Sequence, residues 1–179
     1  MQQDIKLEHI NIGGGLGIDY SNPEINYIAD FDSYFKVIST FLRIPNNVKL
    51  HFELGRSIVA QCGIVLSKVI FTKTTANTNF AIIDAGMNDL MRPALYEAKH
   101  KIASLNPNSL TDNEYSIVGP ICESSDIFAT KLKLATLNRG DFVIIYSCGA
   151  YGRVLANNYN SRELIKECFT ILNKTFIGI

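Results

Sequence analysis

The stretch HINIGGGLGI, residues 9–18, decides how the first part of this chain folds. An apolar run ends in three consecutive glycines, Gly13, Gly14 and Gly15, and each glycine costs conformational entropy on folding. Backbone N–H groups at a strand-to-helix turn bind phosphate, which makes a phosphate-binding loop one interpretation. The alternative is a flexible turn, since the stretch lacks both a Walker A lysine and the GxGxxG register.

The segments around this loop predict a βαβ unit. Residues 5–12 are expected to form a strand, residues 23–44 a helix with apolar side chains at helical spacing, and residues 48–52 a second, parallel strand. One such unit cannot bury both faces of a parallel sheet, so residues 1–56 resemble the end of a larger α/β domain. The residues expected to begin the helix are Ser21 or Asn22 as its cap and Pro23 at its first position.

The remainder, residues 57–179, is expected to be mostly antiparallel β-structure. Strand-rich runs cover residues 57–73, 79–86 and 141–152, and the polar turn TTANTN separates the first two. The short helical stretches expected among them are around residues 92–99, 125–129 and 162–172.

Composition sets the broad class of protein. Of 179 residues, 47% are hydrophobic and 19% charged, and the net charge is zero, which favours a packed core and argues against nucleic-acid or anionic-membrane partners. No apolar run has the roughly 18 residues of a membrane span, and the N-terminus does not resemble a signal peptide, so a cytoplasmic location is expected. The 4 cysteines have no C-x-x-C spacing, which predicts free thiols and no metal site.

A second candidate loop, ELGRS, follows the strand at residues 48–52. Glu53, Gly55 and Arg56 would lie on the same rim as the glycine loop, because the carboxyl ends of parallel strands share one edge. A guanidinium there can bind a carboxylate or phosphate through two hydrogen bonds. The alternative is a surface Arg–Glu pair of little energetic value.

Three later motifs add candidate residues. In DAGMNDLMRPALYEAKH, residues 84–100, Arg92 and Tyr96 face the same way on a helical turn and could hold a carboxylate; the alternative is a solvated arginine. In VGPICESSD, residues 118–126, a Gly-Pro turn presents Cys122, either as an acid or nucleophile or as a small core residue. In SCGAYG, two glycines flank Tyr151, which suits an aromatic ring on a ligand or an ordinary buried tyrosine.

The order of these motifs is more specific than any one of them. GGGLG, E-x-GR, DAGMNDLMRPALY, GP-x-CESSD and GAYG followed by NYNSR resemble the carboxyl-terminal half of the diaminopimelate decarboxylase family, pyridoxal-phosphate enzymes of the alanine racemase type. The resemblance runs from about His9 to Arg162. It implies an α/β plus all-β fold: the end of a (β/α)8 barrel that binds pyridoxal 5′-phosphate at residues 1–56, then a mainly antiparallel β-domain at residues 57–179. It also implies a head-to-tail homodimer with shared active sites.

The resemblance further implies a reaction and its residues. The reaction is the decarboxylation of meso-2,6-diaminopimelate to L-lysine and CO2 in lysine biosynthesis, with Cys122 as the proton donor contributed across the dimer interface. The far end of this substrate would place its carboxylate on Arg56 and Arg92 and its ammonium on Glu123. The implied cofactor-binding residues are Gly13, Gly14, Gly15, Glu53, Leu54, Gly55, Arg56 and Tyr151. The implied substrate-binding residues are Arg56, Arg92, Tyr96, Glu123 and Tyr151.

The sequence departs from the family pattern in several places. Leu54 replaces the proline of the usual EPGR loop, Arg153 follows GAYG, and Glu163 and Leu164 stand where Pro-Arg is usual. The family's Y-x-V-K-A-N strand, whose lysine anchors the cofactor, and its ring-stacking histidine are not in these 179 residues. We therefore expect the chain by itself to be inactive, whether as a truncated piece, part of a split gene or a decayed reading frame.

Two alternative functions stay open. One is a related decarboxylase of ornithine, arginine or carboxynorspermidine, whose substrates have a bare distal amine and need no arginine clamp. The other is an inactive remnant β-domain. The unpaired strand edges of a partial barrel also predict association with another chain.

Overall fold

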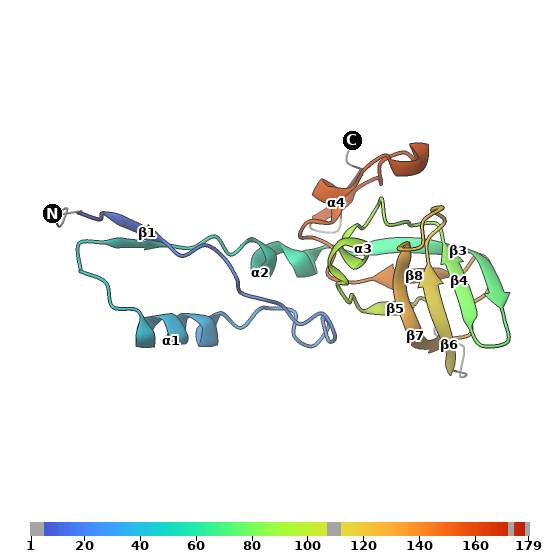
Figure 1. The fold of residues 1–179 in the computed structure, drawn as a ribbon, viewed down its shortest axis with the longest axis horizontal. Coiled ribbons are helices and arrows are strands. Elements are labelled where there is room, and N and C mark those ends of the chain that lie inside the picture. The colour runs from blue at the N-terminus through green and yellow to red at the C-terminus, as the bar shows by residue number, and fades with distance from the viewer. Residues whose placement is uncertain (1–5, 107–111, 172–173, 178–179) are drawn as a thin grey trace.

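The computed structural model describes residues 6–106, 112–171 and 174–177. Figure 1 shows an elongated molecule in which an arm, residues 6–54, extends from a curved six-stranded sheet. The arm contains β1 (His9–Asn11), α1 (Phe31–Phe41) and β2 (Lys49–His51). No helix in the described part of the chain has the length and apolar character needed to cross a membrane.

The arm is the predicted βαβ unit. β1 and β2 pair in parallel, with Ile10 opposite Leu50. Phe52, which directly follows β2, contacts α1, where the rings of Tyr34 and Phe35 both pack edge-on against its ring. Both expected strands are confirmed but are shorter than predicted, and residue 5 of the first lies outside the described residues.

The prediction of a helix over residues 23–44 is wrong in its first third. α1 begins after Asp30, whose carboxylate accepts the Ser33 N–H at 2.9 Å and so caps the helix in place of Ser21 or Asn22. The preceding segment instead forms turns around Asp19, which accepts hydrogen bonds from the side chain of Asn26 and the backbones of Ser21 and Asn22. These bonds lower the pKa of Asp19 to about 2, the Asn26 amide contributing most.

The strand expected to begin at residue 57 also begins later. The chain first forms α2 (Gly55–Val59) and the 3-10 turn η1 (Ala60–Cys62), and β3 (Val65–Thr74) follows. The helix is favoured locally because the Ser57 hydroxyl donates to the Leu54 carbonyl at 2.8 Å. This stretch therefore forms a short helical connection between the arm and the sheet, although its β-branched residues favour a strand.

The six-stranded sheet holds most of the core. Its strands besides β3 are β4 (Asn79–Ile83), β5 (Ile102–Ser104), β6 (Asp112–Val118), β7 (Ile127–Ala135) and β8 (Phe142–Ile145). The order is β5-β8-β3-β4-β6-β7, antiparallel except for the parallel pair β4 and β6. The two outermost strands, β5 and β7, also contact each other, so the sheet curls toward closure. The mainly antiparallel character expected of this part is confirmed.

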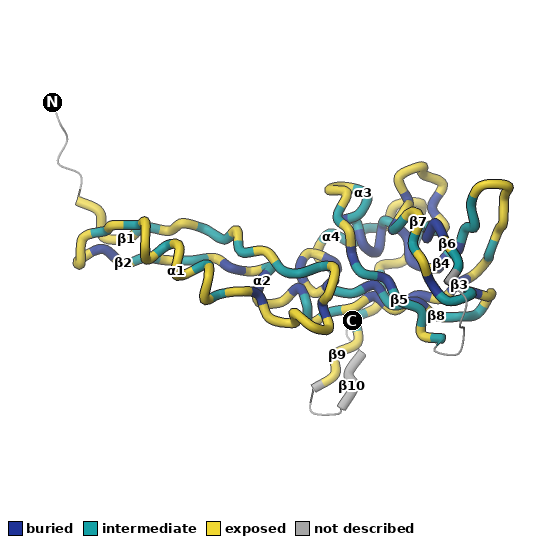
Figure 2. The backbone as a smooth tube through the Cα atoms, turned by 90° about the horizontal axis from the view of Figure 1, so that it is seen from below, coloured by how far each residue is buried: buried dark blue, intermediate teal, exposed yellow. Residues whose placement is uncertain are grey.

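Burial is concentrated in this sheet. Figure 2 shows the dark-blue buried residues gathered among the sheet strands and few of them along the arm. The fully buried apolar side chains of the core include Val69, Ile83, Leu90, Ile117 and Ile145. By contrast, α1 has no buried residue. The arm is therefore held by few of its own apolar contacts.

Short elements complete the chain. They are α3 (Arg92–Tyr96), α4 (Gly152–Leu155), the 3-10 turn η2 (Tyr159–Ser161), β9 (Cys168–Ile171) and β10 (Lys174–Ile177). The helical stretch expected near 92–99 is confirmed as α3. Those expected at 125–129 and 162–172 are wrong, because Ile127 opens β7 and residues 168–171 pair with β10. In both cases strand pairing decides the conformation over the local helical pattern.

Candidate functional site

The glycine loop and the ELGR loop lie against each other. The backbone N–H of Glu53 donates to the carbonyl of Gly13 at 2.8 Å. A Cβ atom placed on Gly14 would stand only 2.6 Å from the carbonyl oxygen of Glu53, so a side chain there does not fit. The sequence expectation that both loops share one rim is therefore met by direct backbone contact.

The glycine loop is open on its other side. Gly13 and Gly15 have φ values of +71° and +101°, and a Cβ at either would meet no atom within 4 Å. The Gly13 N–H donates to the Asn11 side chain at 2.8 Å, whereas no described residue accepts from the amides of Gly14 or Gly15. These two N–H groups are available to an anion.

Two residues that the sequence analysis did not single out hold this loop. Asn11 accepts from Gly13 and donates to the Glu53 carboxylate at 2.5 Å, which joins the two loops through one amide group. The Tyr34 hydroxyl donates to the Gly14 carbonyl at 2.9 Å and connects the loop to α1. Side chains alternate between the two faces along paired strands, which puts Asn11 and Glu53 on the same face. This alternation could have predicted the hydrogen bond between Asn11 and Glu53.

Beside these loops lies a pocket with a volume of about 380 Å³. Its lining comes from the arm, from α2 and from the segment that begins with α3. The lining residues are Tyr20, Arg56, Arg92, Tyr96, Ala98 and Lys99. Three of the six are cations and none is an acid, so the pocket suits an anionic group. Of the predicted substrate-binding residues, the structure brings Arg56, Arg92 and Tyr96 together here.

Arg92 is the most unusual of these residues. It is only 5% exposed, so the alternative of a solvated arginine is wrong. Its guanidinium carbon lies 5.7 Å from the ring centre of Tyr20 and 5.8 Å from that of Tyr96. None of the ion pairs within the described residues involves Arg92 or Arg56. A buried guanidinium without a carboxylate partner is a strong candidate for binding one from a ligand.

Unsatisfied polar atoms gather around the same pocket. Within the described residues, Tyr20 Oη, Arg56 Nε and Arg92 Nε are buried without a hydrogen-bond partner, and so is Nε2 of the neighbouring His100. Buried polar groups in native proteins nearly always have partners, and each exception calls for an explanation. A site for an anionic ligand in the pocket would explain the two unpartnered arginine Nε atoms.

Tyr151 lies next to the ELGR loop. A Cβ on Gly55 would stand 3.5 Å from the Tyr151 hydroxyl, and Tyr151 has φ +63°, a left-handed conformation that is uncommon for a side chain of this size. The residue is 45% exposed, which excludes the alternative of an ordinary buried tyrosine. Its loop is set by a close approach of Gly149 to η1, where a Cβ would collide with the Val59 carbonyl at 2.0 Å.

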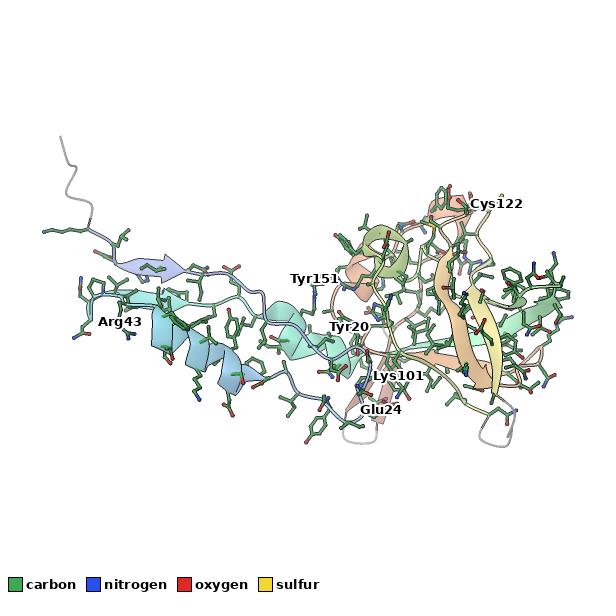
Figure 3. The ribbon with its side chains drawn as sticks, turned by 60° about the horizontal axis from the view of Figure 1, so that its bottom comes forward. Tyr20, Glu24, Arg43, Lys101, Cys122 and Tyr151 are labelled. Atoms are coloured by element: carbon green, nitrogen blue, oxygen red, sulfur yellow. The ribbon has the colours of Figure 1, made fainter. Side chains whose placement is uncertain are left out.

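Cys122 and Glu123 lie on a different part of the molecule. Both are exposed, and Figure 3 shows Cys122 well apart from Tyr20 and Tyr151. Neither lines the pocket. The structure of one chain therefore does not bring these two predicted residues to the site that holds the others.

Asp126 fixes the loop that presents Cys122. Its buried carboxylate accepts the backbone N–H groups of Met87 and Ile121, each at 2.7 Å, and leaves no room for a Cβ on Gly119. Burial raises the pKa of Asp126 above its usual value. This residue was missed by the sequence analysis, although its place at the end of a Gly-Pro turn was a signal for a turn-closing acid.

The segment at residues 84–89 joins the remaining motifs. Asn88 is fully buried, and its carbonyl accepts the Asn157 N–H at 2.9 Å. Arg162 donates to the Asp84 carbonyl at 2.7 Å and lies 3.9 Å from the Asp89 carboxylate. Burial raises the pKa of Asp89. The NYNSR stretch is therefore structural support for the loop that leads into α3.

All four cysteines are free, as predicted. Cys148 is buried, and burial raises its pKa to about 12, so its thiol is protonated near neutral pH. Among the described residues, no cluster of three or more His, Cys, Asp or Glu side chains could hold a metal ion.

Comparison with known proteins places this arrangement in a family. Residues 25–149 match the model of the pyridoxal-dependent decarboxylase C-terminal sheet domain. The chain belongs to this family. A pyridoxal-dependent decarboxylase chain thus carries the paired loops described above. They are the glycine loop and the ELGR loop, at the ends of two parallel strands.

Similar proteins of known name include diaminopimelate decarboxylases. The chain is 49% identical over 162 residues to the diaminopimelate decarboxylase of Bacteroides thetaiotaomicron, covering 90% of this chain and 42% of the relative. It is 40% identical over 175 residues to that of Vibrio cholerae, covering 98% and 41%. A crystal structure of Helicobacter pylori diaminopimelate decarboxylase complexed with L-lysine superposes with a TM-score of 0.84 at 37% identity, covering 97% of this chain and 42% of that one. The chain spans about two fifths of the length of these relatives.

Proposed function

We propose that this chain is the carboxyl-terminal part of an enzyme that decarboxylates meso-2,6-diaminopimelate to L-lysine and CO2 with pyridoxal 5′-phosphate. The observation that carries the proposal is the pocket next to the paired glycine and ELGR loops, in which Arg92 is buried and has no carboxylate partner among the described residues. The 40–49% identity to diaminopimelate decarboxylases supports the same substrate. The cytoplasm is the proposed location.

The residues present fit a phosphorylated cofactor. Within the described residues, the amides of Gly14 and Gly15 have no acceptor, and Arg56 on α2 has a buried Nε without a hydrogen-bond partner. Gly13, Gly14, Gly15 and the loop Glu53–Arg56 would hold the phosphate end, and Tyr151 would contact the cofactor near Gly55. Pyridoxal phosphate, when bound, supplies an electron sink for the electron pair left on the α-carbon when CO2 departs.

The pocket residues would bind and orient the far end of the substrate. Arg56 and Arg92 would hold the distal carboxylate through charge-assisted hydrogen bonds, and Tyr96 would flank it. Fixing this end determines which of the two carboxylates lies at the reacting centre. The distal ammonium would be held by Glu123.

Cys122 and Glu123 are proposed to come from a second subunit. Within one chain they lie apart from the pocket, on an exposed loop fixed by Asp126, which suits residues that protrude into a neighbouring molecule. Cys122 would donate a proton to the α-carbon after CO2 leaves. A homodimer with two shared sites, each using the arginines of one subunit and the thiol of the other, follows from this arrangement.

Residues 1–56 are proposed to be the end of a (β/α)8 barrel and residues 57–179 a separate β-domain. The described β1–β2 sheet has only two parallel strands, and its exposed α1 carries apolar side chains such as Phe41, which is 79% exposed. Such a unit needs further strands and helices to cover it. The remaining three fifths of the relatives' length would supply them, together with the lysine that anchors the cofactor.

The experiment is an assay of the chain combined with the amino-terminal portion of its own enzyme or of a close relative. With pyridoxal phosphate and meso-diaminopimelate, a folded complex is expected to release L-lysine and CO2. Competition with L-ornithine is the control, because ornithine has no distal carboxylate for Arg92. A preference for ornithine would favour the related decarboxylases, and no turnover from a folded, cofactor-loaded complex would favour a remnant domain.

A further inference from the structure

We infer that Tyr20 is a positioning residue for the distal carboxylate of the substrate and that it acts through Arg92; this inference rests on the proposed function. Tyr20 follows the glycine loop in the arm, whereas Arg92 begins α3 beside the sheet. The guanidinium carbon of Arg92 lies 5.7 Å from the centre of the Tyr20 ring and 5.8 Å from that of Tyr96. Arg92 is therefore flanked by two aromatic rings, one from each part of the chain.

Aromatic partners suit this arginine better than an acid would. An aspartate or glutamate beside Arg92 would compete with the substrate carboxylate for the same N–H groups, and displacing it would cost binding energy. A ring face attracts the cation through its quadrupole while leaving the in-plane N–H donors free. Since no ion pair within the described residues involves Arg92, the two rings are its electrostatic support.

Tyr20 is itself held in place from behind. Its ring packs edge-on against His100, with ring centres 5.0 Å apart and an interplanar angle of 73°. His100 is fixed by a 2.8 Å contact between Nδ1 and the Tyr146 carbonyl. Burial, with a smaller contribution from Arg92, lowers the pKa of His100, which keeps the imidazole uncharged beside the guanidinium. Ring contacts thus connect four side chains in the order His100, Tyr20, Arg92 and Tyr96.

The ring of Tyr20, and not its hydroxyl, carries this role. The Tyr20 hydroxyl is buried, and no residue in the described part of the chain forms a hydrogen bond with it. Replacing it with hydrogen therefore removes an unsatisfied group and keeps the aromatic face, whereas an aliphatic side chain of similar size removes the face. Phenylalanine and leucine at position 20 separate the two contributions.

The experiment measures ligand binding by calorimetry to the assembled enzyme without pyridoxal phosphate, that is the chain combined with the amino-terminal portion, and to its Tyr20→Phe and Tyr20→Leu variants, with meso-diaminopimelate and L-lysine as probes. Both probes carry an amino-acid end and a distal ammonium, but only diaminopimelate has the second carboxylate. Tyr20→Phe is expected to bind diaminopimelate like the wild type. Tyr20→Leu is expected to bind it about three- to tenfold more weakly and to bind lysine unchanged.

Other results of these binding measurements contradict either the inference about Tyr20 or the proposed function. Unchanged diaminopimelate binding by Tyr20→Leu, an equal loss for both probes, or a loss with Tyr20→Phe overturns the inference while leaving the proposed function standing. A folded wild-type assembly that does not prefer diaminopimelate over lysine overturns the proposed function and the inference with it. If Tyr20→Leu does not fold, the NMR signal of Arg92 Hε in the wild type decides: two flanking rings shift it upfield, and an unshifted signal overturns the inference.

Discussion

The backbone N–H of Glu53 donates a 2.8 Å hydrogen bond to the carbonyl of Gly13, so the glycine loop and the ELGR loop are fixed to each other without a ligand. The contact continues the parallel pairing of β1 and β2 beyond the ends of both strands. A phosphate bound by one loop would therefore meet the other already in place. Such preorganisation reduces the entropic cost of binding.

Gly14→Ala tests the close contact between these loops. The new Cβ would lie 2.6 Å from the Glu53 carbonyl oxygen, so the loops must separate. We expect pyridoxal phosphate binding to weaken at least about tenfold and stability to fall by roughly 1–3 kcal/mol. Absorbance titration of the assembled enzyme measures the first. Gly17→Ala is the matched control, because its Cβ would meet no atom within 4 Å; equal losses for both variants would contradict the role of the contact.

Arg92→Gln tests the anionic pocket. Removing a buried guanidinium that binds a carboxylate is expected to raise the KM for diaminopimelate by about thirtyfold or more. Arg43→Gln is the control, since Arg43 is exposed and donates only to the Ser39 carbonyl in the last turn of α1. Steady-state kinetics and the melting temperature of each variant are measured. A normal KM in folded Arg92→Gln would remove Arg92 from the substrate site.

The proposed sharing of sites between subunits predicts complementation. Cys122→Ala and Arg92→Gln homodimers of the full enzyme are each expected to be nearly inactive. When the two are unfolded together and refolded, half of the dimers are hybrids, and each hybrid contains one site with both residues intact, so about one quarter of wild-type activity returns. The total lysine released by the mixture measures this. If mixing restores nothing although hybrids form, Cys122 acts within its own subunit or not at all.

Asp126→Ala tests the support of the Cys122 loop. The change leaves the buried N–H groups of Met87 and Ile121 without acceptors, which is expected to reduce the free energy of unfolding by about 2–4 kcal/mol. Asp32→Ala is the comparison, because Asp32 is exposed in the first turn of α1 and its loss should cost under about 1 kcal/mol. Urea unfolding gives both values, and similar costs would speak against the support role.

His100 predicts a pH dependence of stability. Because burial lowers the pKa of His100 in the folded state, the unfolded chain takes up this proton first as the pH falls below about 6.5. Stability is therefore lost from that pH downward until the folded-state pKa is reached. Urea unfolding at pH 7.5 and pH 5 measures the loss, and His100→Gln should reduce it. The same loss in the variant would assign the pH dependence to other groups.

Much of the local structure was predictable from the sequence. The alternation of apolar residues in the sheet strands, the βαβ order and the two rim loops depend on short-range patterns, and the structure has all of them. The errors lie where side-chain hydrogen bonds or strand pairing outweigh the helical pattern of apolar residues. Asp19 and Asp30 shorten the expected helix by accepting nearby backbone amides, and pairing with β10 keeps residues 168–171 extended.

The sequence by itself determined the set of chemical groups: the glycine amides, the arginines and the Cys122 thiol, each recognisable from its motif. Only the tertiary structure decided which of them meet. Arg92 and Tyr20 come from distant segments, and their stacking depends on how the arm joins the sheet, which no local pattern encodes. The separation of Cys122 from the pocket has the same origin, because the turn closed by Asp126 faces away from the arm in one chain.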